Sequence, residues 1–297
     1  MLPTFIIAGA GKSGTTTLWS QLNTHPQVCM ARIKEPAFFS EIKGMNEGGG
    51  PGAPTASGSY SRGLAWYESL FTAENSHRAF GEASTLYMHA PDAAGLIRRH
   101  IPSVRLVFIL RDPVARMYSQ YWQERKAGMR LPDFDAMLDA GHPRMRRYAY
   151  NSHYREHLER FLAIFPRSQI LILFSERLRT LPGTTFDEAC TFIGVEPGLR
   201  TRELGRSHNT AALPRWPTLQ RLLKSPACNV LRVTLHDGIK PPLRAAVHLL
   251  RQTNIKDFDY PPLAPAQKDR LIPIFQDDIS FVEQLANCSL SHWRKVA

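Results

Sequence analysis

A glycine-rich turn near the start of the chain carries the first residues that could do chemistry. Gly9-Ala10-Gly11-Lys12-Ser13-Gly14, called here the glycine turn, follows a short apolar run over residues 4–8 and precedes a helical pattern. Such a turn presents free backbone N–H groups and the positive end of the helix dipole to an anion. Lys12 adds a full charge. Hydroxyl donors follow along the chain at Ser13, Thr15, Thr16 and Thr17. The pattern predicts a site for a phosphate-like group.

The glycine turn differs from the nucleotide-binding motif G-x-x-x-x-G-K-[ST] at one required position. Gly11-Lys12-Ser13 matches the end of that motif, but Ile6 stands where its first glycine belongs. The clearest apolar strand that follows ends in Arg111 rather than in an aspartate able to hold magnesium. These departures disfavour an ordinary ATPase, and a P-loop kinase that uses ATP and magnesium is kept as an alternative.

A second candidate binding group stands where the predicted strand over residues 105–110 ends. Arg111 follows this strand, Asp112 can cap a helix, and Pro113 suits the first helical position. Parallel sheets bind ligands beyond the carboxyl ends of their strands, and a guanidinium fork matches a phosphate well. Ser119 lies two helical turns later and can face the same way. A surface salt bridge is the other interpretation of Arg111.

Strands separated by helices are predicted to position these groups. The predicted strands cover residues 4–8, 79–81, 105–110 and 169–174, and the predicted helices cover 15–22, 113 onward and 152–165. This alternation is typical of βαβ units and a parallel sheet. We therefore expect an α/β fold.

Several short motifs, taken in order, resemble those of the PAPS-dependent sulfotransferases, where PAPS is 3′-phosphoadenosine 5′-phosphosulfate. They are Gly11-Lys12-Ser13-Gly14-Thr15-Thr16, then Lys34-Glu35-Pro36-Ala37-Phe38-Phe39, then Arg111-Asp112-Pro113 with Ser119 eight residues after the arginine. The branch that the chain resembles is that of bacterial relatives of the heparan sulfate sulfotransferases. The resemblance covers about residues 4–195 and implies a single domain over 1–297 with a P-loop-type, three-layer core, a central parallel sheet flanked by helices.

The resemblance also implies roles for individual residues. Lys12 to Thr17 would cradle the 5′-phosphosulfate of PAPS, and Lys12 would stabilise the bridging oxygen as sulfuryl leaves, without a metal. Arg111 and Ser119 would bind the 3′-phosphate, and Arg206 is a further candidate there. Glu35 would act as general base on an acceptor hydroxyl, on a glycan or a glycosylated small molecule. The residues expected to contact the acceptor are Lys34, Phe38, Tyr87 and Tyr154. Ala83 stands where heparan-type enzymes often carry a lysine, which weakens the expectation of a heparan-like acceptor.

Positive charge is concentrated in the C-terminal third of the chain. The formal net charge is +11, and residues 200–251 hold ten Lys and Arg against Glu203 and Asp237. This basic part, which we expect to be partly helical, favours an anionic partner, an anionic glycan among them, or is a solvated surface. A nucleic-acid-binding protein is a further alternative, although no recognised binding module is present. A Gly/Ser/Pro-rich stretch over 44–63 is expected to be a loop or lid.

The remaining features bear on compartment and metal. The four cysteines are far apart, the start of the chain lacks the pattern of a signal peptide, and no apolar run approaches the roughly 20 residues of a membrane span. We therefore expect a cytoplasmic protein without a membrane span. His153-Tyr154-Arg155-Glu156-His157 fits the zinc pattern H-x-x-E-H, but the same residues belong to the sulfotransferase resemblance.

Overall fold

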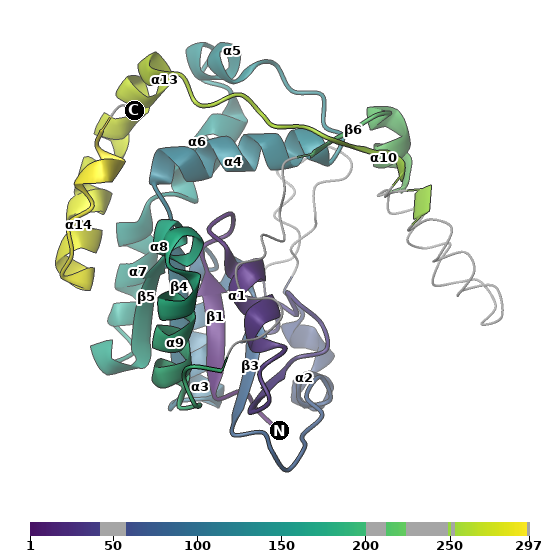
Figure 1. Cartoon of the computed structure of the whole chain (residues 1–297), viewed down its shortest axis with the longest axis vertical. Helices are drawn as coiled ribbons and strands as arrows, with labels where there is room; N and C mark the ends of the chain where they lie inside the picture. Colours follow the sequence, from purple (N-terminus) through teal and green to yellow (C-terminus); the bar gives the residue numbers. More distant parts are fainter. Residues whose placement is uncertain (42–57, 200–211, 224–248, 251–252, 296–297) are drawn as a thin grey trace.

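A five-stranded parallel sheet lies at the centre of the molecule (Figure 1). The computed structural model describes residues 1–41, 58–199, 212–223, 249–250 and 253–295. The strand order is β2-β3-β1-β4-β5, which makes β1 the central strand. The strands are β1 (Phe5–Gly9), β2 (Val28–Met30), β3 (Ala79–Ala83), β4 (Arg105–Leu110) and β5 (Ile170–Phe174). All four pairings are parallel, so the five carboxyl ends lie along one edge of the sheet.

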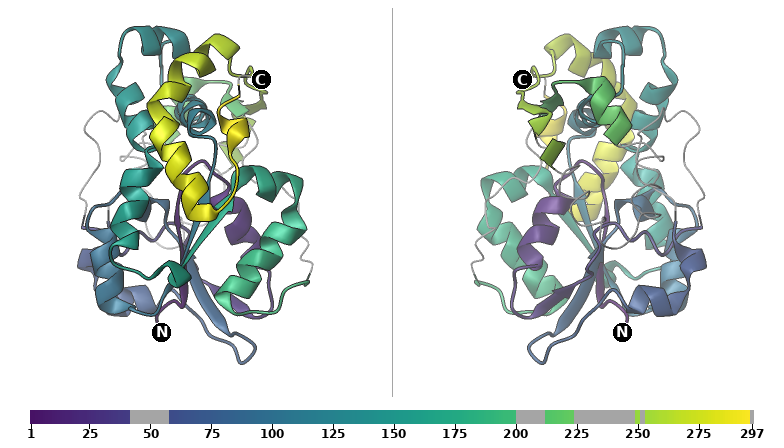
Figure 2. Two further views of the ribbon diagram at one scale, coloured as in Figure 1. Left: turned by 90° about the vertical axis from the view of Figure 1, so that its left-hand side faces the viewer. Right: turned by 90° about the vertical axis from the view of Figure 1, so that its right-hand side faces the viewer.

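Helices cover both faces of the sheet, as the two views of Figure 2 show. Successive residues of β1 alternate between two apolar cores, because strand side chains point to opposite faces: Phe5 and Ile7 enter one core and Ile6 and Ala8 the other. The first core is closed by α1 (Thr15–Leu22), α8 (Ser175–Thr180) and α9 (Pro182–Ile193). The second core is closed by α2 (Leu64–Glu68), α3 (Ala93–His100), α4 (Pro113–Lys126), α6 (Pro143–Tyr150) and α7 (Tyr154–Leu162). The expected three-layer α/β architecture is confirmed.

The close packing of β3 against β1 depends on a glycine. Gly81 pairs with Phe5, and a Cβ at residue 81 would lie 2.0 Å from the Phe5 ring. Both residues are in the middle of the sheet, and Phe5 is fully buried. Glycine is therefore required here, because the far end of the Phe5 ring occupies the space that a Cβ would take.

The C-terminal residues form additional elements that pack on the second core. β6 (Ala212–Pro214) pairs antiparallel with β7 (Ile255–Asp257), and α10 (Pro217–Leu223) follows β6. Next come α13 (Pro265–Leu271) and α14 (Gln276–Ala286), which bury Phe275, Val282 and Trp293 between them and the core. α5 (Phe134–Asp139) lies between α4 and α6 in the chain. Among the described helices, none combines the length and the apolar character that crossing a membrane requires.

The sequence predictions match most of these elements. The helix over 15–22 and the strand over 105–110 have the expected bounds, and Asp112 caps α4 with its carboxylate, which accepts from the N–H groups of Val114 and Ala115 at 2.9 and 3.2 Å. The helix predicted over 152–165 is shorter, because a turn at Ser152 precedes α7. Most of the stretch over 44–63 and most of the basic part from 200 to 251 lie outside the described residues. In the described part of the first stretch, Tyr60–Arg62 form a short 3-10 helix.

Candidate active site

The glycine turn connects β1 to α1 at the carboxyl edge of the sheet. Gly14 precedes the helix with φ 101°, and no side chain caps the first turn of α1. Lys12 has φ 71°, a left-handed conformation that costs a non-glycine residue about 1–3 kcal/mol and that clusters at functional sites. The hydroxyl of Ser13 is fully buried and has no hydrogen-bond partner among the described residues. These donors are what an oxyanion would require.

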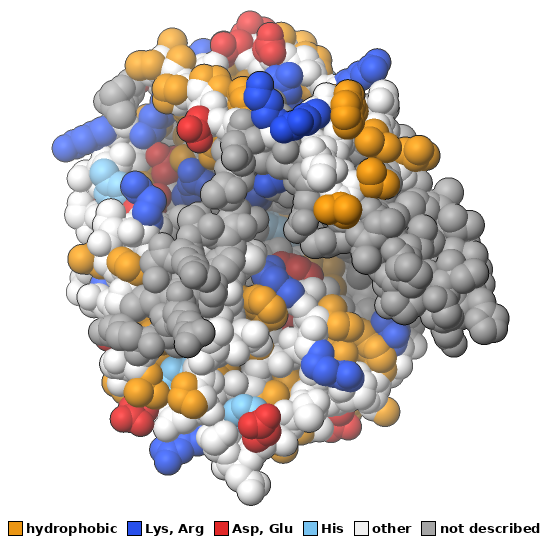
Figure 3. All heavy atoms as spheres, turned by 45° about the vertical axis from the view of Figure 1, so that its right-hand side comes forward, with side chains coloured by type: hydrophobic (Ala, Val, Ile, Leu, Met, Phe, Trp, Pro, Cys, Tyr) orange, Lys and Arg blue, Asp and Glu red, His pale blue; other side chains and the backbone are white. Residues whose placement is uncertain are grey.

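Lys12 is surrounded by other cations. Its Nζ donates to Oε1 of Gln123 at 3.0 Å, and no carboxylate pairs with it in the part of the chain that the structure describes. Burial, followed by the charges of neighbouring cations, lowers the pKa of Lys12 to about 8; these cations are Arg111, Lys126, Arg116 and Lys34. The positive charges of four further side chains therefore act on Lys12, and two of these side chains, Arg111 and Arg116, also contact the glycine turn. Figure 3 shows Lys and Arg side chains in a hollow on one face of the molecule.

Arg111 stands at the end of β4, as the sequence predicts. One guanidinium nitrogen, Nη1, lies 3.4 Å from the carbonyl oxygen of Lys12, and the side chain is half-buried. The hydroxyl of Tyr154 donates to the carbonyl oxygen of Arg111 at 2.7 Å and fixes the end of the strand. Arg111 thus lies beside the glycine turn with a guanidinium that no described carboxylate neutralises.

Arg116 is a member of the site that the sequence analysis did not single out. Its guanidinium is buried and donates only to neutral groups, the hydroxyl of Ser152 at 2.6 Å and the carbonyl oxygens of Tyr148 at 2.9 Å and Gly11 at 3.3 Å. Burial lowers the pKa of Arg116 to about 10, so the side chain is still charged at neutral pH. It places a positive charge directly behind the glycine turn.

One face of α4 lies along the glycine turn. Arg116 bonds to Gly11, Gln123 bonds to Lys12, and the charge of Lys126 acts on Lys12. Ser119 lies between them, and steps of three, four and three residues put all four on one helical face. We call these four residues the α4 stripe. The helix lies across the carboxyl ends of the strands in Figure 1.

Glu35 lies on the other side of the glycine turn, in the connection after β2. Its Oε2 accepts from the N–H of Thr85 at 2.7 Å, and its Oε1 accepts from Nζ of Lys34 at 2.6 Å. The hydroxyl of Thr85 donates to the same carboxylate at 3.2 Å and lies 3.7 Å from where a Cβ of Gly11 would be. The carboxylate is therefore next to the glycine turn, and it stays reachable because the side chain is 39% exposed.

The backbone at Glu35 is also left-handed, with φ 61°, and so is that of Ala37, with φ 50°. Three positive-φ, non-glycine residues thus occur within the two segments that form the site. Thr85, which holds the Glu35 carboxylate, was missed by sequence analysis because a threonine after a strand carries no signal of its own.

Three residues expected to contact the acceptor are instead buried. Phe38 stacks on Tyr67 with ring centroids 4.5 Å apart, Tyr87 donates its hydroxyl to Glu82, and Tyr154 is bonded to Arg111. All three side chains lie in the second core with almost no exposure. Their assignment as acceptor contacts stays a prediction, and the described side chains offer almost no surface to a ligand. Lys34 remains partly exposed beside Glu35, and Arg206 lies outside the described residues.

The zinc interpretation of residues 153–157 finds no support in the geometry. His153 bonds to Oδ2 of Asp278 at 2.9 Å, while His157 bonds to the carbonyl oxygen of Tyr150 at 2.8 Å. Within the described ranges, no three His, Cys, Asp or Glu side chains group as metal ligands. The imidazoles serve as hydrogen-bonding groups between α7 and its neighbours.

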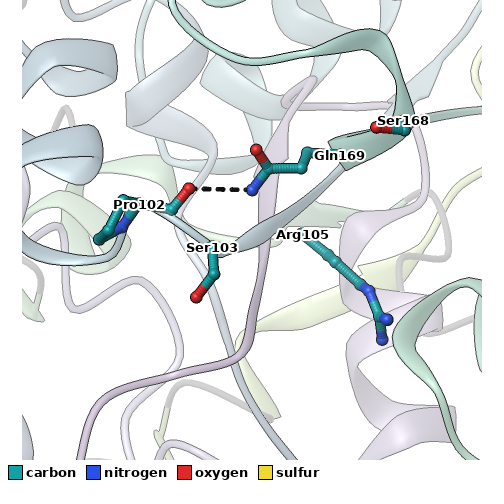
Figure 4. Close-up of a pocket in the computed structure, with 5 residues that line it drawn as sticks. All are labelled: Pro102, Ser103, Arg105, Ser168 and Gln169. Carbon is teal, nitrogen blue, oxygen red and sulfur yellow. Dashed lines mark hydrogen bonds between the residues drawn. The ribbon is translucent and has the colours of Figure 1, made fainter.

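A shallow pocket at the opposite edge of the sheet lacks converging catalytic groups (Figure 4). It is lined by Pro102, Ser103, Arg105, Ser168 and Gln169. The amide of Gln169 donates to the carbonyl oxygens of Pro102 at 3.1 Å and of Val104 at 2.7 Å, which occupies its donors. The candidate site is therefore the carboxyl edge.

Comparison with known proteins agrees with this geometry. The sulfotransferase domain model matches residues 2–207. The mouse bifunctional heparan sulfate N-deacetylase/N-sulfotransferase 4 is 32% identical over 209 residues, which are 66% of this chain and 23% of that protein. The human heparan sulfate glucosamine 3-O-sulfotransferase 6 is 29% identical over 202 residues, 65% of this chain and 53% of that protein. This chain thus spans less than a quarter of the first relative and about half of the second.

Among solved structures, a sulfotransferase from Alicyclobacillus acidocaldarius aligns with 99% of this chain and 100% of its own, with a TM-score of 0.72 and 22% identity. That likeness shows a shared fold. The matched sulfotransferase domain contains the glycine turn, Glu35 and Arg111. The chain therefore belongs to the sulfotransferase family.

Proposed function

We propose that the enzyme transfers a sulfuryl group from PAPS to an acceptor hydroxyl, and that the carboxyl edge of the sheet binds both substrates. The observation that carries this proposal is that the guanidinium groups of Arg111 and Arg116 contact the glycine turn, while no described carboxylate pairs with Lys12. The buried, unpartnered hydroxyl of Ser13 fits the same donor set. A nucleotide with phosphate groups at both its 3′ and 5′ positions would satisfy these donors.

The glycine turn and the α4 stripe would bind different ends of this nucleotide. Residues 12–17 offer backbone N–H groups, hydroxyls and the Lys12 ammonium to the 5′-phosphosulfate. Arg111 and Ser119 would hold the 3′-phosphate, since Arg111 lies at the strand end and Ser119 is on the face of α4 that lines the turn. Sulfuryl carries less charge than phosphoryl, so fixed donors and Lys12 would stabilise the departing oxygen.

Glu35 would act as the general base. The acceptor oxygen attacks sulfur in line while its proton passes to the Glu35 carboxylate, and the bond between sulfur and the bridging phosphate oxygen breaks. The product nucleotide keeps that oxygen, opposite the Lys12 ammonium. The Lys34 ammonium at 2.6 Å and the N–H of Thr85 at 2.7 Å orient the carboxylate, so its free lone pairs have a defined direction. A glycan is the proposed acceptor class, because both relatives are named for heparan sulfate.

Calorimetric titration with the product nucleotide, 3′-phosphoadenosine 5′-phosphate, tests the donor site. Wild type should bind it in the micromolar range and bind adenosine 5′-phosphate at least about tenfold more weakly, because the second compound lacks the 3′-phosphate. Arg111→Ala should abolish this preference. Arg105→Ala is the matched control, since Arg105 begins the strand that ends before Arg111 and points away from the site. Preferential binding of ATP with magnesium would replace the proposal by the kinase alternative.

A Glu35→Gln variant tests the base. Its amide oxygen can still accept from Thr85, so nucleotide affinity should be unchanged while transfer falls about 10²–10⁴-fold. Transfer is measured with ³⁵S-labelled PAPS and a panel of glycans that carry either free amines or only hydroxyls. Full activity of Glu35→Gln would remove the base assignment. Labelling confined to amines would replace the hydroxyl acceptor while leaving sulfuryl transfer intact.

A further inference from the structure

A carboxylate is buried behind the site and does not take part in the proposed reaction. Glu82, on β3, is 0% exposed, and no lysine or arginine in the described part of the chain pairs with it. Three hydroxyls satisfy it instead: Tyr67 and Tyr87 donate to its Oε1 at 3.1 and 2.6 Å, and Ser84 donates to its Oε2 at 2.7 Å. Burial raises the pKa of Glu82 to about 7 despite these hydrogen bonds. A group so costly to bury calls for a functional explanation.

Two of the three hydroxyls also hold the segment that carries Glu35. The Oγ of Ser84 accepts from the N–H of Ala37 at 2.9 Å, and the Oη of Tyr87 accepts from the N–H of Phe39 at 3.2 Å. Because each hydroxyl donates its hydrogen bond to Glu82, its lone pairs are available to accept from these backbone N–H groups. The N–H of Glu35 itself donates to the carbonyl oxygen of Ala83 at 2.8 Å.

Residues 35, 37 and 39 therefore all form hydrogen bonds with residues 83–87, at and just after the end of β3, and Glu35 and Ala37 have left-handed backbones. Such conformations persist only where the surroundings impose them. The hydrogen bonds at 37 and 39 are among the contacts that hold this segment, together with those from Ser59 to the carbonyl oxygens of Pro36 and Ala37 at 2.6 and 2.9 Å, and both bonds at 37 and 39 depend on the direction of a hydroxyl proton. Glu82 determines that direction at both positions.

We propose that Glu82 is the positioning residue for Glu35, acting through the hydroxyls of Ser84 and Tyr87 on the backbone of residues 35–39. The inference rests on the proposed function in taking Glu35 as the group that must be aimed. It adds that the orientation of Glu35 is determined by a buried carboxylate, that of Glu82, which no substrate contacts.

The two tyrosines provide a matched pair of variants. Both hydroxyls donate to the same oxygen of Glu82 and both side chains are fully buried, but only Tyr87 also accepts from the 35–39 backbone. Tyr87→Phe should speed hydrogen exchange in a peptide covering residues 35–40 about tenfold, the factor expected for the loss of one hydrogen bond. Tyr67→Phe should leave that exchange within twofold of wild type. Both variants should keep wild-type affinity for 3′-phosphoadenosine 5′-phosphate, because the glycine turn is untouched.

The same pair is then compared in the transfer assay. Tyr87→Phe and Glu82→Gln should lower kcat about 10- to 100-fold with little change in KM for PAPS, whereas Tyr67→Phe should stay near wild type. Equal effects of the two tyrosine variants on exchange and on kcat would overturn the proposal and leave Glu82 a purely structural group. A fully active Glu35→Gln would instead defeat the proposed function, while the exchange result would still report on the positioning.

Discussion

Replacing Lys12 with methionine should make the unliganded protein more stable. The charged form of Lys12 is disfavoured by burial and by the cations around it, which lower its pKa from 10.5 to about 8. Each pKa unit corresponds to about 1.4 kcal/mol, so the charged Lys12 side chain destabilises the folded state by up to about 3 kcal/mol. Because the side chain is only partly buried, water screens some of that cost, and we expect Lys12→Met to raise the free energy of unfolding by about 1–3 kcal/mol at pH 7.

The pH dependence gives this expectation a sign. The unfolded chain holds the Lys12 proton up to about pH 10.5 and the folded protein only up to about pH 8, so the destabilisation is complete below pH 8. It fades as the pH rises between the two values, where the folded protein has already released the proton, and it vanishes above about pH 10.5, where neither state holds it. The advantage of the variant should therefore fall below about 1 kcal/mol at pH 10.

Urea denaturation of both proteins at pH 7 and pH 10 measures the difference. Lys34→Met is the matched control, since Lys34 has a carboxylate partner at 2.6 Å and its removal should bring no gain. Nucleotide should act in the opposite direction. At one hundred times its wild-type Kd, 3′-phosphoadenosine 5′-phosphate stabilises wild type by about 2.7 kcal/mol, and a variant that binds tenfold more weakly gains only about 1.4 kcal/mol. A Lys12→Met protein that is less stable than wild type at pH 7, or whose advantage is the same at pH 10, would refute the reasoning.

Two further predictions concern the scaffold. Gly81→Ala should lower the free energy of unfolding by about 1–3 kcal/mol, because its Cβ would lie 2.0 Å from the ring of Phe5. Gly95→Ala on α3 is the control: nothing lies within 4 Å of its new Cβ, so it should be neutral or stabilising by up to about 1 kcal/mol. Comparable losses of stability for the two variants in urea denaturation would contradict this prediction. Asp112→Ala should cost about 1–2 kcal/mol through loss of the α4 cap, in addition to the loss of its ion pair with Lys268. Asp112→Asn should recover the cap but not the ion pair; an asparagine variant as unstable as the alanine variant would show that the cap contributes nothing.

The sequence predicted the parts of the site that depend on local pattern. The strand over 105–110, the cap at Asp112 and the helix after it are all signalled within a dozen residues, and they carry Arg111 to the sheet edge without reference to the rest of the chain. β2 was missed because three residues, Val28–Met30, are too short to show a period. Its strand character comes from pairing with β3, which is distant in sequence.

The sequence does not decide the position of a side chain whose type fits two environments. Tyr87 and Tyr154 could either face a substrate or carry a hydroxyl into the core, and only the packing of residues 85–88 and of α7 decides. Arg116 was missed for a related reason: an arginine in a helix rich in polar residues is expected at the surface, yet this one is buried. Thr85 and Gln123 enter the site through contacts with residues 50 and 111 positions away, which no local pattern records.

The contacts between α4 and the C-terminal residues determine where the chain can be truncated. The hydroxyl of Tyr118 donates to the carbonyl oxygen of Pro261 at 2.9 Å, and Lys268 pairs with Asp112 at 3.2 Å. Trp293 is 99% removed from solvent in the same core as α4. All three C-terminal residues lie beyond residue 207, where the match to the sulfotransferase domain stops. We therefore expect a fragment cut at that boundary to keep the whole glycine turn, between β1 and α1, but to lose contacts that support α4, the helix that lies along this turn.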